Sequence, residues 1–323
     1  MITEIITNPL ILNLFIVIAS LVLMAKASDL AVYGVSRYAR KLGLSDYIVG
    51  ILIVAIAASM PELVASITGA TLGNDGIVLG TLFGSNLAGL ALVLGITTIF
   101  GKKVSTKSKV LRGTNLFMWG LIMLPILLLF DGKLSRIDGI FLVLAFIFYV
   151  VYIWRKEGSL GKVKKDVKFE TILKDGFIFA GSLIVILLSA RYLVFSSIMI
   201  ANSLGISSFL IALSVIAIGA TMPDIMVAIK SVKQKHEGVG YGNVVGSMVV
   251  KALLFLGVIA IINPIEYSVL ALGNLIFFRT AMVTLVLFWA TKGMIKRKQG
   301  LVLLLMYAIF MIKENSFSCG VSF

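Results

Sequence analysis

The sequence is poor in charged residues, cysteine and histidine, and each shortage excludes a class of protein. Only 14% of its 323 residues are charged, against roughly 25% in an ordinary soluble domain. The one cysteine, Cys319, cannot form a disulfide within the chain. Together with the one histidine, His236, it is also too little for a Cys/His zinc cluster. A disulfide scaffold and a zinc domain are therefore excluded.

Apolar residues, in contrast, make up most of the chain. They account for 59% of the residues, and the mean hydropathy is +1.07. A single soluble core stops growing near ~250–300 residues, so a soluble protein could not bury this much apolar surface. The sequence predicts an integral membrane protein and excludes a soluble enzyme. The first apolar run is longer than a signal-peptide core and only Glu4 precedes it, so we expect a retained membrane helix.

The apolar residues fall into ten stretches that could each cross a membrane as a helix, which takes about 20 residues. No soluble domain separates them, and the longest polar connection is residues 155–174. We therefore expect an all-α polytopic membrane protein with ten transmembrane helices. The expected spans are 9–36, 45–72, 77–100, 110–130, 136–154, 175–204, 207–230, 239–262, 267–291 and 299–313.

The 29 basic residues are distributed unevenly between the connections. Of these, 22 fall on the side that holds residues 155–174, 3 fall on the other side, and 4 lie inside spans or at their edges. Basic residues collect on the cytoplasmic side of membrane proteins. We expect a multi-pass protein of the cell membrane, with the N- and C-termini outside and the loop 155–174 in the cytoplasm. Orientation in the lipid bilayer and attraction to anionic lipid account for the excess of basic residues. Nucleic acid is not an expected partner, because the basic residues are not accompanied by a face of base-reading groups.

An internal repeat appears when the second half of the sequence is aligned with the first. Residues 53–62 read IVAIAASMPE and residues 215–224 read VIAIGATMPD, and the same alignment pairs 42–45 with 204–207 and 80–85 with 242–247 without a gap. Each half holds five expected spans, an odd number, so the second half enters the membrane from the opposite side. This predicts two inverted five-helix repeats, 1–154 and 175–323, joined by a linker at 155–174. Inverted repeats are typical of secondary transporters, whose substrates bind near the midplane where interrupted helices meet.

Two acidic residues, Glu62 and Asp224, lie well inside expected spans and correspond in the same alignment. A carboxylate at bilayer depth costs at least ~2.5–3.5 kcal/mol, so it normally has a cation, a proton or a partner. A purely structural role as caps of broken helices is the alternative, but hydroxyls in both halves favour a binding site. All these groups are oxygen donors, which suit hard cations such as Ca²⁺ and Na⁺. The hydroxyls belong to Ser59, Thr221, Ser85 and Ser247.

These segments resemble the calcium/cation antiporter superfamily, and within it the prokaryotic sodium/calcium exchangers. The family pattern is close to G-T-S-x-P-E followed by G-N-x-x-G-S-N in each half. Here residues 57–62 read AASMPE, 80–86 read GTLFGSN, 219–224 read GATMPD and 242–248 read GNVVGSM. The resemblance implies alternating access, with ions exchanged at one central cluster. It also implies the metal ligands Glu62 and Asp224, the backbone carbonyls of Ala55 and Ala217, and the path-lining side chains of Asn86 and Asn243.

The sequence departs from the family pattern where side-chain oxygens are expected. The threonine of the first motif is replaced by Ala58 and Ala220. Four residues after the Gly-Ser serine, where the family carries Asn or Asp, the two halves carry Gly89 and Lys251. At least three side-chain oxygens are therefore missing, and one of these positions has become a cation.

Lys251 lies near the middle of its expected span, four residues after Ser247. It either snorkels to an interface or pairs with Glu62 or Asp224. We hypothesise that it pairs and stands in for one transported cation. The predicted function is then a secondary active antiporter that exchanges Ca²⁺ against Na⁺ or H⁺. An H⁺-coupled exchanger of another cation, a channel and a transport-impaired homologue remain as alternatives. We expect no enzymatic activity and no cofactor, and the oligomeric state is left open, with a monomer compatible with the sequence.

Overall fold

The structure is a computed structural model of the chain. It describes residues 9–41, 52, 55–101, 103–106, 115–156, 169–222, 224–225, 228–229, 237–267 and 272–318. Cys319 and His236, which the sequence singled out, lie outside these ranges, and so does Pro223 of the motif at 219–224.

Helices form nearly all of the described chain, as the composition predicted. Three of the segments, η2, η4 and η5, are short π-helices, and η3 is a 3₁₀ turn. In the first half the helical elements are α2 (Pro9–Lys41), α4 (Ala55–Ala58), α5 (Met60–Thr71), α6 (Asp75–Ala88), η2 (Gly89–Val93), α7 (Leu94–Gly101), α8 (Asn115–Leu128), η3 (Leu129–Asp131) and α9 (Arg136–Lys156). In the second half they are α10 (Phe169–Leu204), α11 (Ser208–Ile211), η4 (Ala212–Ile216), α12 (Ala217–Ala220), α14 (Glu237–Val249), η5 (Val250–Phe255), α15 (Leu256–Ile262), α16 (Gly273–Thr291) and α17 (Arg297–Ser318).

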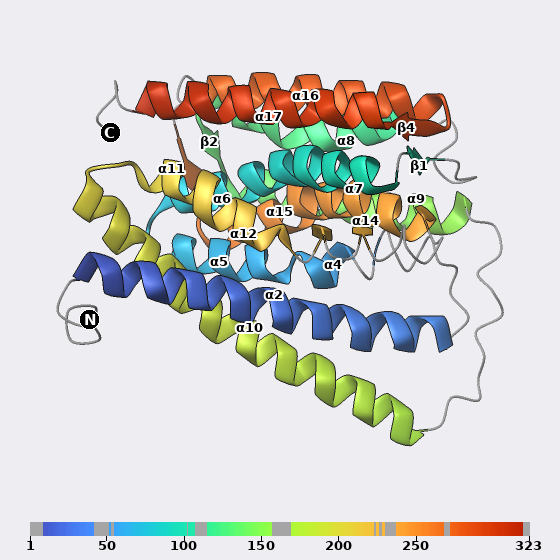
Figure 1. The fold of residues 1–323 in the computed structure, drawn as a ribbon, viewed down its shortest axis with the longest axis horizontal. Coiled ribbons are helices and arrows are strands. Elements are labelled where there is room, and N and C mark those ends of the chain that lie inside the picture. The colour runs from blue at the N-terminus through green and yellow to red at the C-terminus, as the bar shows by residue number, and fades with distance from the viewer. Residues whose placement is uncertain are drawn as a thin grey trace.

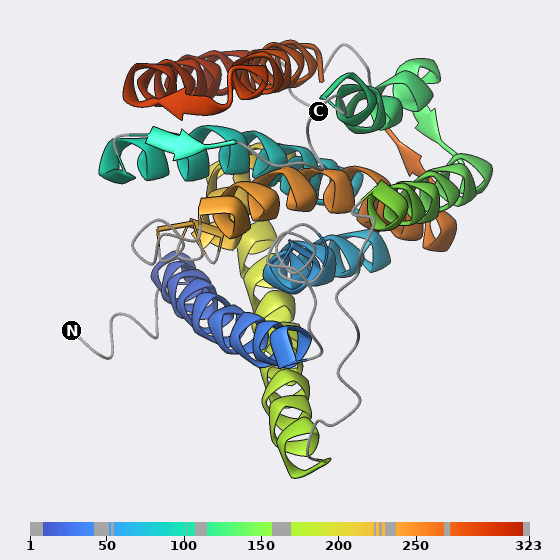
Figure 2. The same cartoon turned by 90° about the vertical axis from the view of Figure 1, so that its right-hand side faces the viewer.

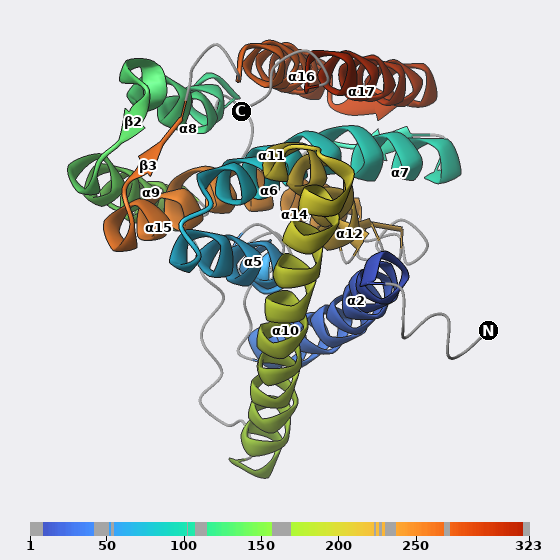
Figure 3. The same cartoon turned by 90° about the vertical axis from the view of Figure 1, so that its left-hand side faces the viewer.

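The helices are arranged in layers around a buried centre (Figures 1, 2 and 3). Helices α2 and α10 pack against each other on one side, and α16 and α17 lie side by side on the opposite side. Between them run α5, the α6–η2–α7 helix and the α14–η5–α15 helix. The central span Asp75–Gly101 is 94% buried, whereas the outer span Arg136–Arg155 is only 28% buried. The apolar surface of the outer helices therefore remains available to lipid.

Six helices of the described chain are long and apolar enough to cross a membrane. Two further apolar helices, Leu116–Asp131 and Ser208–Ala220, are shorter. The expectation of an all-helical membrane protein is thus confirmed, while the count of ten spans in two inverted repeats stays a prediction. The six spans are Pro9–Ala27, Asp75–Gly101, Arg136–Arg155, Gly176–Leu204, Tyr241–Ile262 and Gly273–Thr291.

Two small antiparallel ribbons, which the sequence did not predict, connect the ends of helices. One pairs β1 (Lys103–Ser105) with β4 (Met294–Lys296), and the other pairs β2 (Lys133–Leu134) with β3 (Ile265–Glu266). Strands this short cannot show a period of two in the sequence. Each ribbon joins two connections that the distribution of basic residues assigns to the same side of the membrane.

The ribbon of β2 and β3 anchors one end of the central helices. Lys133 Nζ lies 2.6 Å from Glu266 Oε1, and this exposed pair raises the pKa of Lys133 through the hydrogen bond and charge of Glu266. The Glu266 amide donates to Asp75 Oδ2 over 3.0 Å at the start of α6. Asn263 Nδ2 donates to the Ala70 carbonyl near the end of α5 over 3.3 Å. These bonds hold α5 and α6 against the end of α15.

Glycines let α6 approach the segment that leads to Asp224. A Cβ atom on Gly80 would lie 2.7 Å from the Phe209 carbonyl oxygen, closer than real Cβ atoms pack. One on Gly84 would lie 3.0 Å from the Cβ of Ala217. Only glycine permits this backbone approach, which places α6 in direct contact with the α11–η4–α12 helix.

Candidate cation-binding site

Glu62 is held in the first turn of α5, just after a break in the helix. Helix α4 ends at Ala58, and Ser59 is the N-cap residue of α5. Pro61 occupies the first turn of α5, where its missing N–H removes no helical bond. The start of a helix favours a negative charge. The side chain of Glu62 is fully buried.

Asp224 is held at a similar break in the second half of the chain. Helix α12 ends at Ala220, and the Thr221 hydroxyl donates to the Ile218 carbonyl over 2.8 Å. The Ile225 amide donates to the Thr221 carbonyl over 3.1 Å, so the backbone resumes helical hydrogen bonding past the break. Asp224 is 1% exposed. Two carboxylates from opposite halves of the chain are therefore both buried within the layers of helices.

Lys251 brings these two carboxylates together. Its Nζ lies 2.7 Å from Glu62 Oε1 and 3.6 Å from Asp224 Oδ2, and its side chain is 1% exposed. The ammonium therefore pairs inside the protein and does not snorkel to an interface. With both carboxylates ionised, the three groups carry a net charge of −1. A buried group of this kind is stable only as a set, because removing one member leaves an uncompensated charge.

Lys251 lies on a π-helix, and so does its counterpart in the first half. The π-helix η5 covers Val250–Phe255, and the π-helix η2 covers Gly89–Val93. The alignment of the two halves that relates Glu62 to Asp224 also relates Gly89 to Lys251. Short π-helical segments occur frequently at functional sites because they displace side chains from regular helical positions.

Further hydrogen bonds fix polar side chains of α14 and α6, and one of them reaches Asp224. Asn243 Nδ2 donates to Asp224 Oδ1 over 2.9 Å. The Ser247 hydroxyl donates to the Asn243 carbonyl over 2.6 Å, and the Ser85 hydroxyl donates to the Leu82 carbonyl over 3.3 Å. A hydroxyl that donates its hydrogen to the backbone keeps its oxygen lone pairs for another partner. These hydroxyls are thus arranged as acceptors.

Several buried side-chain oxygens of α5, α6, α14 and the break before α5 make no hydrogen bond within the described chain. Such groups are costly unless a water, an ion or a ligand satisfies them. They belong to the helices that carry the cluster or to their direct neighbours. They are Glu62 Oε2, Ser59 Oγ, Ser66 Oγ, Thr81 Oγ1, Asn86 Oδ1 and Asn243 Oδ1. This is an all-oxygen set of the kind that hard cations bind.

Thr81 was not singled out from the sequence. It is fully buried on α6, one helical turn before Ser85. The signal was present, because the alignment of the two halves places Thr81 opposite Asn243, the partner of Asp224. A single threonine in an apolar helix otherwise gives no signal, since its hydroxyl usually bonds to its own helix.

The backbone carbonyls of Ala55 and Ala217 take part in regular helical bonds. Each accepts one amide over 3.2 Å, from Ser59 and Thr221 respectively. A carbonyl oxygen has a second lone pair, so their role as cation ligands stays a prediction. Within the described residues, no group of three or more His, Cys, Asp or Glu side chains could hold a metal. Any cation here would instead be held by two carboxylates together with neutral oxygens.

Arg279 is a second basic residue buried among the helices. It is 0% exposed; Nη2 donates to the Ile122 carbonyl over 2.8 Å, and Cζ lies 4.5 Å from the centre of the Phe83 ring. These contacts hold α16 against α8 and α6. We therefore assign Arg279 a packing role.

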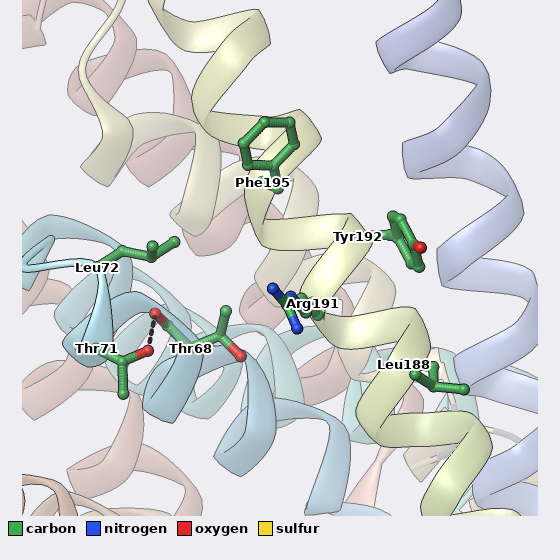
Figure 4. Close-up of a pocket in the computed structure, with 7 residues that line it drawn as sticks. All are labelled: Thr68, Thr71, Leu72, Leu188, Arg191, Tyr192 and Phe195. Carbon is green, nitrogen blue, oxygen red and sulfur yellow. Dashed lines mark hydrogen bonds between the residues drawn. The ribbon is translucent and has the colours of Figure 1, made fainter.

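A separate pocket of about 750 Å³ opens between α5 and α10 (Figure 4). Arg191 projects into it from α10 toward Thr68 and Leu72 of α5, whereas Tyr192 points away toward α2. Apart from Arg191 and the two threonines at positions 68 and 71, its lining is apolar or aromatic. The pocket includes none of the cluster residues.

Comparison with known proteins identifies the chain's relatives. The family model described as "Sodium/calcium exchanger protein" matches residues 12–155 and 175–313. The sodium/calcium exchanger MaX1 of Methanosarcina acetivorans is 28% identical, over 93% of this chain and 97% of its own length. The inner membrane protein YrbG of Escherichia coli is 28% identical, over 81% of this chain and 86% of its own length.

A solved structure shows the same architecture. The sodium-calcium exchanger NCX_Mj, soaked with Na⁺ and Sr²⁺, is similar with a TM-score of 0.72 and 26% sequence identity, over 92% of this chain and 97% of that one. The family match covers most of the chain and both of its halves. The chain therefore belongs to the sodium/calcium exchanger protein family, a family of membrane transporters and not of enzymes.

Proposed function

We propose that this protein is a secondary active cation antiporter that exchanges Ca²⁺ against Na⁺ or H⁺ by alternating access. The transported cation binds at the cluster of Glu62 and Asp224. The ten predicted spans form two inverted five-helix repeats around this cluster, at 1–154 and 175–323. The protein lies in the cell membrane, with both termini outside and residues 155–174 in the cytoplasm.

The observation that carries this proposal is the buried bridge of Lys251 between two symmetry-related carboxylates. A cation is already the group that joins Glu62 to Asp224, at 2.7 Å and 3.6 Å. The unsatisfied buried oxygens of the same and neighbouring helices are the further ligands that we expect for a cation from solution. We expect Ser59, Ser85, Thr221 and Ser247 to contribute to this shell.

Lys251 takes the place of one bound cation in this proposal. A second cation that binds to Glu62 and Asp224 competes with the ammonium for the same oxygens. Two carboxylates and one ammonium leave a single negative charge, which balances a monovalent cation better than a divalent one. A divalent cation is therefore held less tightly than it would be without Lys251.

Tracer flux in proteoliposomes tests this function. We expect ⁴⁵Ca²⁺ uptake to be driven by an outward Na⁺ gradient or by a pH gradient, and to depend on the cluster. Glu62→Gln removes a charge from the cluster and should abolish uptake. Glu266→Gln removes an exposed carboxylate in β3, outside the cluster, and should leave uptake near the wild-type rate. Normal transport by Glu62→Gln would refute the site assignment.

The alternative of a transport-impaired homologue predicts a different result. Such a protein would give no heat signal on titration with Ca²⁺ or Na⁺ and no proton release. A channel would instead give an ionic current proportional to the membrane potential. Its Ca²⁺ flux would not depend on a counter-ion on the opposite side.

A further inference from the structure

The pocket between α5 and α10 is separate from the cation cluster, and the proposed function does not use it. One charged side chain lines it, Arg191, which projects from α10 toward Thr68 and Leu72 of α5 (Figure 4). We propose that this pocket binds an anionic phospholipid with a hydroxylated headgroup, of the phosphatidylglycerol type. The proposal concerns lipid binding only, so its failure leaves the proposed function standing.

Arg191 lies near the middle of the apolar span Gly176–Leu204 and lacks a partner within the residues that the structure describes. Its guanidinium makes no hydrogen bond or ion pair with any of them. A basic side chain inside a span is costly, so it normally pairs with another group or extends to the membrane surface. Arg191 turns toward α5 (Figure 4). The pocket therefore presents an uncompensated positive charge to whatever enters it.

The pocket lies where a lipid headgroup can reach it. Helix α5 ends at Thr71, and the chain turns at Gly73, with a φ of 67°, before α6 begins at Asp75. Irregular backbone of this kind does not face lipid within the hydrocarbon region, so the turn lies at a membrane surface. On the α10 side the lining is open: Leu188 is 57% exposed and Phe195 is 56% exposed. The pocket thus borders both the headgroup region and the hydrocarbon of the bilayer.

The polar groups of the pocket match a phosphate that carries hydroxyls. The planar guanidinium of Arg191 can donate to two phosphate oxygens at once. The Thr68 hydroxyl donates to the Val64 carbonyl over 2.8 Å, and the Thr71 hydroxyl donates to the Thr68 carbonyl over 2.9 Å. Both threonine oxygens therefore keep lone pairs to accept a hydrogen bond but have no hydrogen left for a phosphate. A headgroup with hydroxyls supplies the donors that these oxygens lack.

The remaining lining fits the apolar part of a lipid better than a free anion. It consists of Leu72, Leu188, Tyr192 and Phe195. The volume of about 750 Å³ lies within the ~300–1,000 Å³ of ordinary ligand pockets, and an inorganic phosphate ion would fill only a small part of it. Phosphatidylcholine is also a poor match, because its own ammonium adds a second positive charge and it has no hydroxyl to donate. An anionic lipid satisfies the charge, the hydroxyl acceptors and the apolar walls together.

Mass spectrometry of the intact, delipidated protein in a nonionic detergent tests the proposal. The full chain is titrated with phosphatidylglycerol, with phosphatidylcholine of the same acyl chains, and with inorganic phosphate. We expect one phosphatidylglycerol to bind at least about tenfold more tightly than phosphatidylcholine, and inorganic phosphate not to compete at the same concentration. Equal affinities for the two lipids would overturn the proposal. Competition by inorganic phosphate at equal concentration would show a site for a free anion instead.

Matched arginine variants place the lipid at the pocket. Arg191→Gln removes the charge from an exposed position and should weaken phosphatidylglycerol binding by about tenfold. Arg191→Lys keeps the charge without the planar fork and should lose only part of the affinity. Arg136→Gln changes an exposed arginine at the start of α9 and should bind like wild type. Unchanged binding by Arg191→Gln, or an equal loss in Arg136→Gln, would overturn the proposal.

The two threonines test the choice of headgroup. Replacing Thr68 and Thr71 together by valine keeps the shape of both side chains and removes both acceptor oxygens. We expect the double variant to bind phosphatidylglycerol several-fold more weakly. Its affinity for phosphatidic acid, whose headgroup has no glycerol hydroxyls, should stay at the wild-type value. An equal change for both lipids would overturn the assignment of a hydroxylated headgroup.

Discussion

Replacing Lys251 by methionine should lower the free energy of unfolding and increase the stabilisation that Ca²⁺ gives. At an effective dielectric constant of 20, the 2.7 Å and 3.6 Å contacts correspond to attractions of about 6 and about 5 kcal/mol. The desolvation of three buried groups offsets most of this sum. Breaking a buried ion pair by removing one partner has a net cost of about 3–5 kcal/mol. Methionine nearly fills the same volume, so a cavity adds little to that cost.

Calcium should then stabilise the variant more than the wild-type protein. In the variant, Ca²⁺ meets two free carboxylates and displaces no ammonium, so its Kd is lower. A ligand at one hundred times its Kd adds about 2.7 kcal/mol of stability. We expect Lys251→Met to unfold at a lower Tm than wild type in cation-free buffer and to recover much of the difference when Ca²⁺ is added.

Thermal unfolding of the detergent-solubilised protein measures both effects. The three tryptophans give an intrinsic fluorescence signal, and Lys26→Met, at an exposed lysine on α2, serves as the control. The reasoning is refuted if Lys251→Met and wild type have the same Tm without cations and the same rise in Tm with Ca²⁺. That result would mean that Lys251 does not compensate the two carboxylates.

Two further substitutions test the packing and the polar contacts of the site. Gly80→Ala should destabilise the protein by about 1–3 kcal/mol, because its Cβ would lie 2.7 Å from the Phe209 carbonyl oxygen, whereas Gly89→Ala enters open space and should leave Tm unchanged. Equal Tm values for the two glycine variants would contradict the described contact. Asn243→Leu removes the donor to Asp224 and should cost about 1.5–3 kcal/mol and weaken ⁴⁵Ca²⁺ binding. Unchanged binding would place the cation away from Asp224.

The burial of Glu62, Asp224 and Lys251 could be predicted from the sequence because all three lie inside apolar spans, while cation binding by them stays a prediction. A helical spacing and the gapless alignment of the two halves were enough to relate Glu62 to Asp224. The position of Lys251 in the middle of a span predicted a buried partner, since an ammonium at that depth is costly when unpaired. The structure places Lys251 beside both carboxylates, as this reasoning required.

Other features depend on contacts that a single sequence does not encode locally. No residue type signals the π-helices η2 and η5. The partners of Arg279 include Ile122, which is far from it in the chain. The two ribbons are too short for a pattern. The span expected at 175–204 is found at Gly176–Leu204, but α10 itself begins earlier, at Phe169, in the polar residues before the span.

The position of the bound cation is the most direct test of the account. Crystals grown with Sr²⁺, an anomalous scatterer that replaces Ca²⁺, would show where a divalent cation binds. We predict an anomalous peak between the carboxylate oxygens of Glu62 and Asp224, at distances slightly longer than the about 2.3–2.6 Å of Ca²⁺, with Lys251 Nζ displaced from both. A peak at another position, or a peak at the cluster with Lys251 still in contact with both carboxylates, would contradict the account.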